Sequence, residues 1–235
     1  MKKVIATIMA AGLVAQVASA VDAGVDFASA YVFRGVTFND GTVAQPYVEG
    51  EVLGVTVGTW ANIDIANQGA EAVSEIDLYL GYGLGEVAGY AIDLGYCEYT
   101  YPGTAGNGES EVSLAVSGDV LGYDASVAAF ADVAADGEIG YYEGSLGGGY
   151  DLTADIAASY GVSIGYFDGD DAGFGYAALT FGVEKPITDA LTAGISLTLI
   201  EDLDDDIMTA LRADSVASGI GQEDQVIVVS VGGSF

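Results

Sequence analysis

Carboxylates dominate the side chains in this sequence that could do chemistry. The 235 residues include 35 Asp and Glu, five Lys and Arg, one cysteine and no histidine. Without an imidazole, a serine nucleophile would need an unusual lysine or carboxylate base, and beyond residue 20 the only lysine is Lys185, beside a proline. The glycines at 80–89 are followed by no helix, so they do not form a dinucleotide motif. The sequence therefore predicts neither an enzyme nor a bound cofactor.

The charge balance says which partners are excluded. A formal net charge of -30 repels nucleic acid and attracts cations. Acidic clusters at 168–171 and 201–206 offer oxygen ligands for calcium or magnesium, but neither has the spacing of an EF-hand loop. Because charged loops are usually just solvated, no metal site is predicted. Cys97 is alone, so it forms no disulfide within the chain and is best read as a small filler on a strand.

Residues 1–20 have the three parts of a secretory signal peptide. A basic start, Met1-Lys2-Lys3, precedes the apolar run VIATIMAAGLVA, and Ala18-Ser19-Ala20 is a small-residue cleavage site. We therefore expect an exported protein whose single domain spans 21–235.

The apolar content of this exported chain needs an explanation. Mean hydropathy is +0.41, yet no segment after residue 20 approaches the run of about 18 apolar residues that a membrane-spanning helix needs. Alternation of apolar and polar residues reconciles these facts, with apolar side chains toward lipid and polar ones toward a lumen. The sequence predicts an all-β fold, a transmembrane antiparallel β-barrel in the outer membrane of a Gram-negative bacterium.

Period-2 alternation recurs along the chain. In 191–199, Leu191, Ala193, Ile195, Leu197 and Leu199 share one face, and small polar residues share the other. We predict about twelve strands, with a range of ten to fourteen. They are expected near 24–37, 43–53, 55–66, 75–86, 88–101, 111–121, 123–134, 138–151, 155–167, 174–185, 190–201 and 225–235.

The connections between these segments largely alternate in length. Short ones fall near 53–54, 85–89, 121–122, 152–154 and 186–189, and long ones at 67–74, 102–110, 168–173 and 202–224. Tight turns at one rim and long loops at the other are typical of outer-membrane barrels. The connections at 38–41 and near 135–137 are exceptions, because they are short where long ones are expected.

Strand parity assigns charged side chains to the lumen. The predicted pore-lining residues are nine carboxylates, one arginine and one tryptophan: Asp26, Arg34, Glu49, Glu51, Trp60, Asp64, Asp77, Asp93, Asp119, Asp124 and Glu143. They fit a cation-preferring channel, or a plugged barrel in which Arg34 pairs with neighbouring acids and Trp60 fills the bore. A twelve-stranded barrel is intermediate between filled and open ones.

Aromatic side chains of the opposite parity are predicted to form two membrane-interface girdles. The expected set at the short-turn rim is Phe27, Tyr90, Tyr123, Tyr150 and Phe235, and at the other rim Tyr31, Phe33, Tyr96, Tyr142 and Tyr166. Phe235 would lie at the lipid–water boundary, on the strand that closes the barrel. Aromatic packing in a soluble β-sandwich is the alternative.

Several stretches resemble the TorF-type porins, a family of conserved outer-membrane β-barrel proteins. The first strand, Tyr31-Val32-Phe33-Arg34-Gly35, the segments GTWANIDIA (58–66) and SEIDLYLGY (74–82), and Asp93-Leu94-Gly95-Tyr96 carry the resemblance. The resemblance implies a channel. The aromatic terminus Phe235 is similar to the signal that such barrels present to the barrel-assembly machinery.

The favoured function is passive diffusion of small solutes, with cations preferred. Besides the lipid bilayer and the assembly machinery, the expected partners are thus small solutes or cations. A non-conducting structural or adhesive barrel with acidic surface loops is the alternative, and a secreted soluble β-protein is a weaker one.

Overall fold

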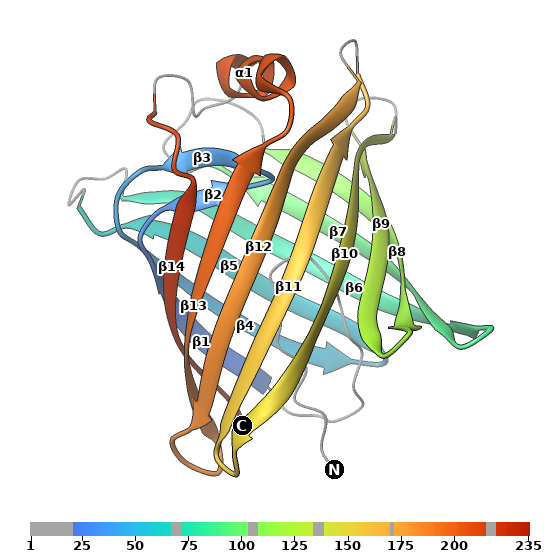
Figure 1. The fold of residues 1–235 in the computed structure, drawn as a ribbon, viewed down its shortest axis with the longest axis vertical. Coiled ribbons are helices and arrows are strands. Elements are labelled where there is room, and N and C mark those ends of the chain that lie inside the picture. Colours follow the sequence, from blue (N-terminus) through green and yellow to red (C-terminus); the bar gives the residue numbers. More distant parts are fainter. Residues whose placement is uncertain (1–20, 67–71, 103–107, 134–138, 170–171, 215–219) are drawn as a thin grey trace.

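Twelve strands form the wall of a closed barrel (Figure 1). The computed structural model describes residues 21–66, 72–102, 108–133, 139–169, 172–214 and 220–235, so the predicted signal peptide and the connection at 135–137 lie outside the described residues. The wall strands are β1 (Val21–Ala28), β4 (Val43–Val52), β5 (Val55–Asp64), β6 (Val73–Val87), β7 (Tyr90–Thr100), β8 (Glu109–Val120), β9 (Tyr123–Asp132), β10 (Ile139–Thr153), β11 (Ile156–Phe167), β12 (Gly173–Pro186), β13 (Leu191–Asp202) and β14 (Gln225–Ser234).

Each wall strand is antiparallel to its neighbour, and the first strand closes the circle. Val25 of β1 pairs with Val231 of β14 on one side and with Pro46 of β4 on the other. The amide of Val21 donates to the carbonyl of Phe235, and the amide of Phe235 donates back, both at 3.0 Å. Closure removes the exposed sheet edges that hydrocarbon would not tolerate. The predicted closed barrel of twelve antiparallel strands is confirmed.

Two-residue turns join several strands at the rim that holds both ends of the described chain, called here the short-turn rim. Leu53-Gly54, Ala88-Gly89 and Leu121-Gly122 all have positive φ at both positions. Such pairs form the tight turns whose twist matches that of the flanking strands. The opposite end, called here the long-loop rim, carries the connection 203–224 and the other long connections.

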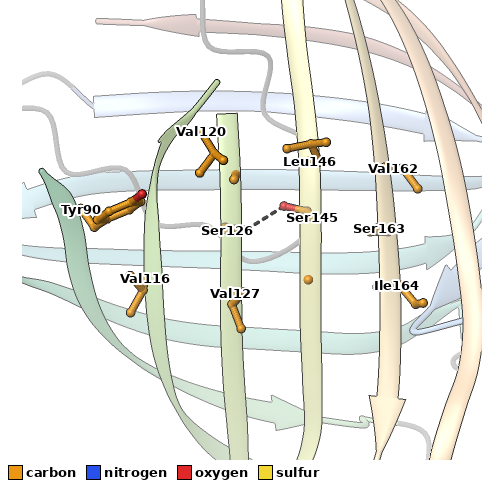
Figure 2. A pocket seen from close by; sticks show the side chains of 12 residues that line it. Tyr90, Val116, Val120, Ser126, Val127, Ser145, Leu146, Val162, Ser163 and Ile164 are labelled. Carbon is orange, nitrogen blue, oxygen red and sulfur yellow. Dashed lines mark hydrogen bonds between the residues drawn. The ribbon is translucent and has the colours of Figure 1, made fainter. Parts of the chain in front are cut away.

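The outward face of the wall is apolar. Leu78, Val127 and Phe181 are 57%, 62% and 51% exposed. Figure 2 shows part of this face, an open groove of about 450 Å³ whose apolar lining includes Val116, Val127 and Leu146. A closed sheet that presents such side chains outward is suited to contact acyl chains.

The first connection differs from the sequence prediction. The predicted strand 24–37 ends at Ala28, and the connection spans 29–42 rather than 38–41. It folds as a separate hairpin of β2 (Tyr31–Phe33) and β3 (Val36–Asn39), drawn in blue in the upper part of the barrel in Figure 1. The prediction was wrong here because strand-forming aromatic and β-branched residues continue past Ala28, to Tyr31, Val32 and Phe33, although the chain leaves the wall.

The described part of the long connection after β13 contains the helix α1 (Asp205–Asp214), at the same end of the barrel. Asp204 begins it, because its side chain accepts hydrogen bonds from the amides of Asp206 and Ile207, both at 3.1 Å. Within the described residues, no helix is both long enough and apolar enough to cross a membrane.

Candidate functional site

The hairpin β2–β3 lies inside the barrel and crosses its lumen. It starts from β1, yet the Tyr31 ring contacts Trp60 of β5 and the Phe33 ring contacts Tyr99 of β7, with centroids 5.4 and 6.0 Å apart. Its tip reaches Glu111 of β8, which is far from β1 around the wall. A segment that touches all these strands occupies the interior. The hairpin therefore narrows the lumen at the long-loop rim.

The tip of the hairpin is a tight turn formed by Arg34 and Gly35, with φ of 50° and 78°. A Cβ on Gly35 would lie 2.8 Å from the Tyr176 ring and 2.9 Å from the end of Met208. Positive φ and this close approach both require glycine at position 35. The turn projects the Arg34 side chain toward the far wall.

The Arg34 guanidinium is held by one carboxylate and three aromatic rings. Its Nη1 and Nη2 donate to the two carboxylate oxygens of Glu111 at 2.7 and 2.8 Å. The guanidinium carbon lies 4.7, 4.5 and 4.1 Å from the ring centroids of Phe33, Phe130 and Tyr141. A bidentate ion pair surrounded by aromatic faces is a strong arrangement for a planar cation.

The surroundings of this ion pair favour the charged form of Arg34. The Tyr99 hydroxyl donates to Glu111 at 2.9 Å. Burial disfavours the charge on Arg34, but the hydrogen bonds and charge of Glu111 outweigh it and raise the pKa of the guanidinium. The two side chains remain 15% and 17% exposed, so water reaches them.

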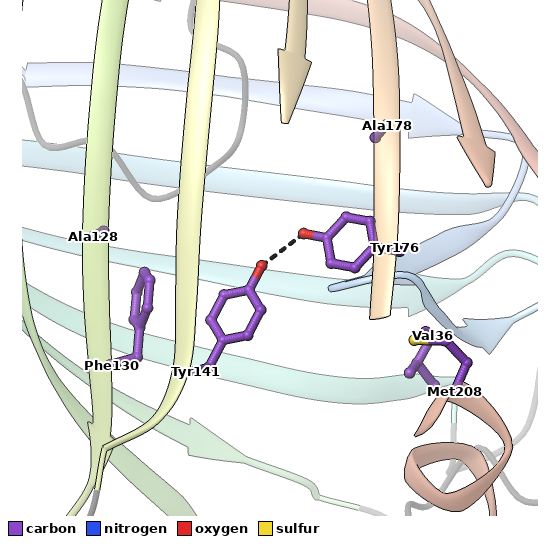
Figure 3. Close-up of a cluster of buried hydrophobic side chains, with 7 residues drawn as sticks. All are labelled: Val36, Ala128, Phe130, Tyr141, Tyr176, Ala178 and Met208. Carbon is purple, nitrogen blue, oxygen red and sulfur yellow. Dashed lines mark hydrogen bonds between the residues drawn. The ribbon is translucent and has the colours of Figure 1, made fainter. Parts of the chain in front are cut away.

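A second hydrogen-bonded group lies beside this ion pair, and Figure 3 shows its two tyrosines, Tyr141 and Tyr176. The hydroxyls of Tyr141 and Tyr176 are 2.7 Å apart, and they donate to Glu143 at 2.7 and 2.9 Å. Phe130, Ala128 and Ala178 surround them in the same buried cluster. The aromatic groups on β9, β10 and β12 thus form a rigid wall opposite the hairpin.

Helix α1 and the segment after it hold the hairpin from above. Met208 is fully buried and packs in one cluster with Val36 of β3. Gln222 donates to the carbonyl of Gly35 at 2.9 Å, and the Thr37 hydroxyl accepts from the amide of Glu223 at 2.9 Å. Arg212 on the helix pairs with Asp202 at the end of β13. The hairpin is therefore fixed on both sides.

The lumen near the short-turn rim is lined differently. Many inward positions there are small, among them Gly147, Gly149, Gly161 and Ser159, as the register of β10 and β11 shows. The Tyr79 hydroxyl donates to Glu49 at 2.9 Å. This part of the inward face therefore combines small side chains with carboxylates.

The strand registers place the predicted pore-lining residues of the wall on one face, which is the face of Tyr47, Trp60 and Tyr79. Trp60 pairs with Tyr47 and with Asp77, and Asp119 pairs with Asp124. The same parity holds for the rest of the set: Asp26, Glu49, Glu51, Asp64, Asp93 and Glu143. Arg34 reaches the lumen from the hairpin and not from a wall strand.

Two groups separate within this face. Glu49, Glu51, Asp93, Asp119 and Asp124 lie near the short turns. Trp60, Asp77, Glu143 and Arg34 belong to the filled part, and Trp60 is only 8% exposed. Nε1 of Trp60 and one carboxylate oxygen of Asp77 are buried there without a hydrogen-bond partner in the described structure.

Three aromatic residues differ from the predicted girdles. Tyr31 is 8% exposed and packs on Trp60 and Phe38 inside the barrel, and Phe33 packs on Phe38, Tyr99 and Arg34. Both were assigned outward because their strand was extended through the hairpin. Phe27 does face outward, at 46% exposed, but it is the next-to-last residue of β1 and not at the short-turn rim.

The other predicted girdle residues lie on the outer face. Tyr90 and Tyr123 begin strands at the short-turn rim, Tyr150 lies near the end of one, and Phe235 is 68% exposed. Toward the long-loop rim, the Tyr166 ring contacts both Tyr142 and Phe174, and the Tyr96 hydroxyl donates to Glu98.

The sequence reasoning missed the partners of Arg34. Glu111, Phe130 and Tyr141 share the inward parity of their strands, so parity alone would have found their side of the wall. What no local pattern reveals is that Arg34 reaches them across the lumen.

The acidic cluster at 201–206 has structural partners. Asp204 caps α1 and Asp202 binds Arg212, while 170–171 lie outside the described residues. Among the described positions there is no group of three or more His, Cys, Asp or Glu that could hold a metal ion. Cys97 is half-buried on β7, and the structure describes it as a free thiol.

Comparisons with known proteins agree with the architecture. A family model described as a bacterial protein of unknown function (Gcw_chp) matches residues 14–206. No curated protein matches the sequence.

Solved structures of porins share the fold at low identity. The NanC porin has a TM-score of 0.53 and 10% identity, and the comparison covers 92% of this chain and 98% of that one. The KdgM porin in complex with disordered oligogalacturonate has a TM-score of 0.54, 11% identity and coverages of 92% and 99%. An outer membrane channel from Pseudomonas putida F1 has a TM-score of 0.55, 11% identity and coverages of 94% and 97%. The chain thus shares the closed β-barrel fold of these solved porins.

Proposed function

This chain belongs to the Gcw_chp family of bacterial proteins, and we propose that it is an outer-membrane channel for passive diffusion of small solutes, with a preference for cations. The resemblance to TorF-type porins is consistent with this proposal. The apolar outer face supports insertion into a bilayer, and the polar inward face supports a path for water and solutes.

The observation that carries the preference for cations is the charge of the inward wall. Beyond residue 20 the sequence has only three cationic side chains, Arg34, Lys185 and Arg212. Arg34 is paired with Glu111, Arg212 with Asp202, and Lys185 has the outward parity of β12. No described wall strand therefore directs a cationic side chain inward, whereas many direct carboxylates there.

Carboxylates around a narrow, low-dielectric bore focus the potential and concentrate cations. Glu49, Glu51, Asp93, Asp119 and Asp124 provide this charge near the short-turn rim. An oligogalacturonate, the ligand in the KdgM complex, carries a carboxylate on each sugar, so it would be repelled by this wall. The proposed solutes are therefore small, and neutral or positively charged.

Reversal potential in a salt gradient tests the proposal. The protein is reconstituted in a planar bilayer with KCl at different concentrations on the two sides, and the expected sign is that of potassium selectivity. A reversal potential of the chloride sign would overturn the cation preference. The Arg34→Ala and Trp60→Ala variants are expected to change the conductance, because both side chains belong to the filled part of the lumen.

The hairpin inside the lumen favours one alternative, a non-conducting structural or adhesive barrel. Hairpin β2–β3 occupies the lumen at the long-loop rim, and helix α1 packs on it through Met208. Protein that inserts and is well folded, but gives no conductance steps, would support this alternative and exclude the channel.

Two contacts with the membrane and the cell follow from the same proposal. The outward aromatic side chains near the two rims are proposed to lie at the lipid–water interfaces. They are Tyr90, Tyr123 and Tyr150 at the short-turn rim and Tyr96, Tyr142 and Tyr166 at the long-loop rim. The strand that ends in Phe235 is proposed to be read by the barrel-assembly machinery.

A further inference from the structure

The wall around Arg34 has the composition of a binding site for a planar cation. Glu111 supplies both carboxylate oxygens, and Phe130 and Tyr141 supply ring faces at 4.5 and 4.1 Å from the guanidinium carbon. Tyr99 donates to Glu111 and fixes the carboxylate. We call these four wall residues the cation cage.

The cation cage is built without the hairpin. Its residues come from four consecutive wall strands, β7 to β10, and their registers place them side by side. Glu111 pairs with Cys97, two residues from Tyr99, and Phe130 pairs directly with Tyr141. Only Arg34 and Phe33 come from the hairpin, from a part of the chain 77 residues away from Glu111. We therefore expect the four residues to keep their places on the wall when the Arg34 side chain is removed.

We propose that the cation cage binds solutes that carry a guanidinium group, and that Arg34 occupies it as a tethered stand-in for that group. This inference rests on the proposed cation-preferring channel, because the solute reaches the cage through the lumen. It deepens that function by naming a solute class.

The chemistry of the cage discriminates between cations. A guanidinium is planar, so its paired N–H groups match a carboxylate while its faces stack on aromatic rings. A bare sodium or potassium ion has no N–H group, so it forms neither of these two hydrogen bonds with the carboxylate. A neutral urea has the same shape but lacks the charge that the Glu111 carboxylate and the rings attract.

Tethering explains how Arg34 and a free solute would compete. A group held on the same chain acts at an effective concentration on the order of millimolar or higher. A solute must displace Arg34, so the native protein is expected to bind more weakly than a variant that lacks this side chain. Displacement would also free the hairpin tip from Glu111.

Calorimetric titration of the full-length barrel in detergent micelles tests the proposal without requiring conduction. Arg34→Ala protein is titrated with methylguanidinium, and with N-methylurea as the neutral control. We expect methylguanidinium to bind with a dissociation constant on the order of a millimolar. Methylurea should bind to this variant at least about tenfold more weakly. Methylguanidinium should bind to the native protein at least about twofold more weakly, because a tethered competitor at an effective concentration near the dissociation constant doubles the apparent constant.

Two double variants locate the binding. Arg34→Ala with Glu111→Gln should weaken methylguanidinium binding by at least about tenfold, because a charged hydrogen-bond acceptor is lost. Arg34→Ala with Glu184→Gln should not, since Glu184 faces the lumen near the short-turn rim and is outside the cage. Equal loss in both variants would indicate general attraction to an acidic lumen and would overturn the proposal.

A second variant distinguishes a failure to fold from a failure to bind. Where Arg34→Ala does not give a folded barrel, Arg34→Gln removes the charge and keeps most of the side-chain volume. No methylguanidinium binding to a folded variant overturns the cage, whatever the bilayer measurement shows. Binding without conductance steps would keep the cage and exclude the channel.

Discussion

The Tyr79 hydroxyl on β6 donates a hydrogen bond to the Glu49 carboxylate on β4, across the intervening strand β5, at 2.9 Å. The phenol ring lies over Gly58 of β5, where a Cβ would come within 2.2 Å of the ring. A glycine on the middle strand thus lets a tyrosine reach past it and position an inward carboxylate. The negative charge of Glu49 and the hydrogen bond that it accepts from Tyr79 can therefore be removed by separate substitutions.

Glu49→Gln is expected to lower cation selectivity, whereas Tyr79→Phe is not. The glutamine loses the charge but keeps an acceptor for the hydroxyl, and the phenylalanine loses the hydrogen bond but keeps the charge. The cation-to-anion permeability ratio should fall by about twofold in Glu49→Gln, since a unit charge ~4 Å away contributes about 1 kcal/mol in water and less at larger distances.

The two variants are compared by reversal potential in dilute KCl and again near 1 M. The difference should fade in concentrated salt, where the Debye length is about 3 Å. A larger selectivity change in Tyr79→Phe than in Glu49→Gln would contradict the electrostatic account.

The substitution Gly35→Ala is expected to loosen the hairpin, and Gly54→Ala provides a matched control. Both glycines have nearly the same φ, 78° and 81°, so both substitutions carry the same backbone strain of about 1 kcal/mol. Only Gly35 has neighbours within reach, Tyr176 and Met208 at 2.8 and 2.9 Å, while a Cβ on Gly54 meets nothing within 4 Å. The overlap should add about 1–3 kcal/mol of destabilisation at Gly35.

Fluorescence of Trp60 reports this change, since it is the sole tryptophan and its ring lies 5.4 Å from that of Tyr31 on the hairpin. Gly35→Ala should shift the emission toward that of a solvated indole and raise the single-channel conductance. Gly54→Ala should leave both unchanged. Identical spectra for the two variants would mean that the hairpin tolerates the added methyl.

The wall strands were predictable from the sequence, because each has its own alternation and length. The hairpin was not, since Tyr31, Val32 and Phe33 have the aromatic and β-branched composition of a wall strand. Contacts with Trp60 and Tyr99, distant in sequence, place them inside the barrel. One local signal was available. Arg34-Gly35 has the form of the Leu53-Gly54 and Leu121-Gly122 turns, a residue followed by glycine, and it marks a tight turn within the predicted strand.

The predicted charges illustrate the same limit. Parity identifies which carboxylates face inward, because it depends only on neighbouring residues. Parity does not identify which of these carboxylates is already paired with a cationic side chain. Glu111 is neutralised by Arg34 from 77 residues away, whereas Asp119 and Asp124 remain exposed near the short turns.

The substitution Met208→Ala is expected to release helix α1 from the hairpin. Met208 is fully buried against Val36, and truncation of a buried methionine costs about 2–5 kcal/mol. Thr209→Ala is the control, because the neighbouring Thr209 is exposed.

Limited trypsin digestion measures the release, since Arg212 lies on the helix and few other cleavage sites exist in the chain. Cleavage after Arg212 should be at least about tenfold faster in Met208→Ala, because it follows the population of the opened helix. Unchanged cleavage would show that the helix is held by its other contacts, among them the ion pair of Arg212 with Asp202.

The side chain of Phe235 is expected to matter for assembly more than for the closure of the barrel. Its amide and carbonyl pair with Val21, and these bonds do not depend on the ring, which is 68% exposed. Phe235→Ala keeps the backbone pairing and loses the aromatic side chain, whereas Phe235→Tyr keeps both. The amount of folded protein in the outer-membrane fraction should fall several-fold in Phe235→Ala and stay near native in Phe235→Tyr.

Refolding both variants into detergent micelles separates assembly in the cell from stability of the barrel. If both variants refold equally well in micelles, the defect of Phe235→Ala in the cell lies in recognition of the aromatic terminus by the assembly machinery. A Phe235→Ala protein that accumulates normally in the outer membrane would overturn the role proposed for this residue.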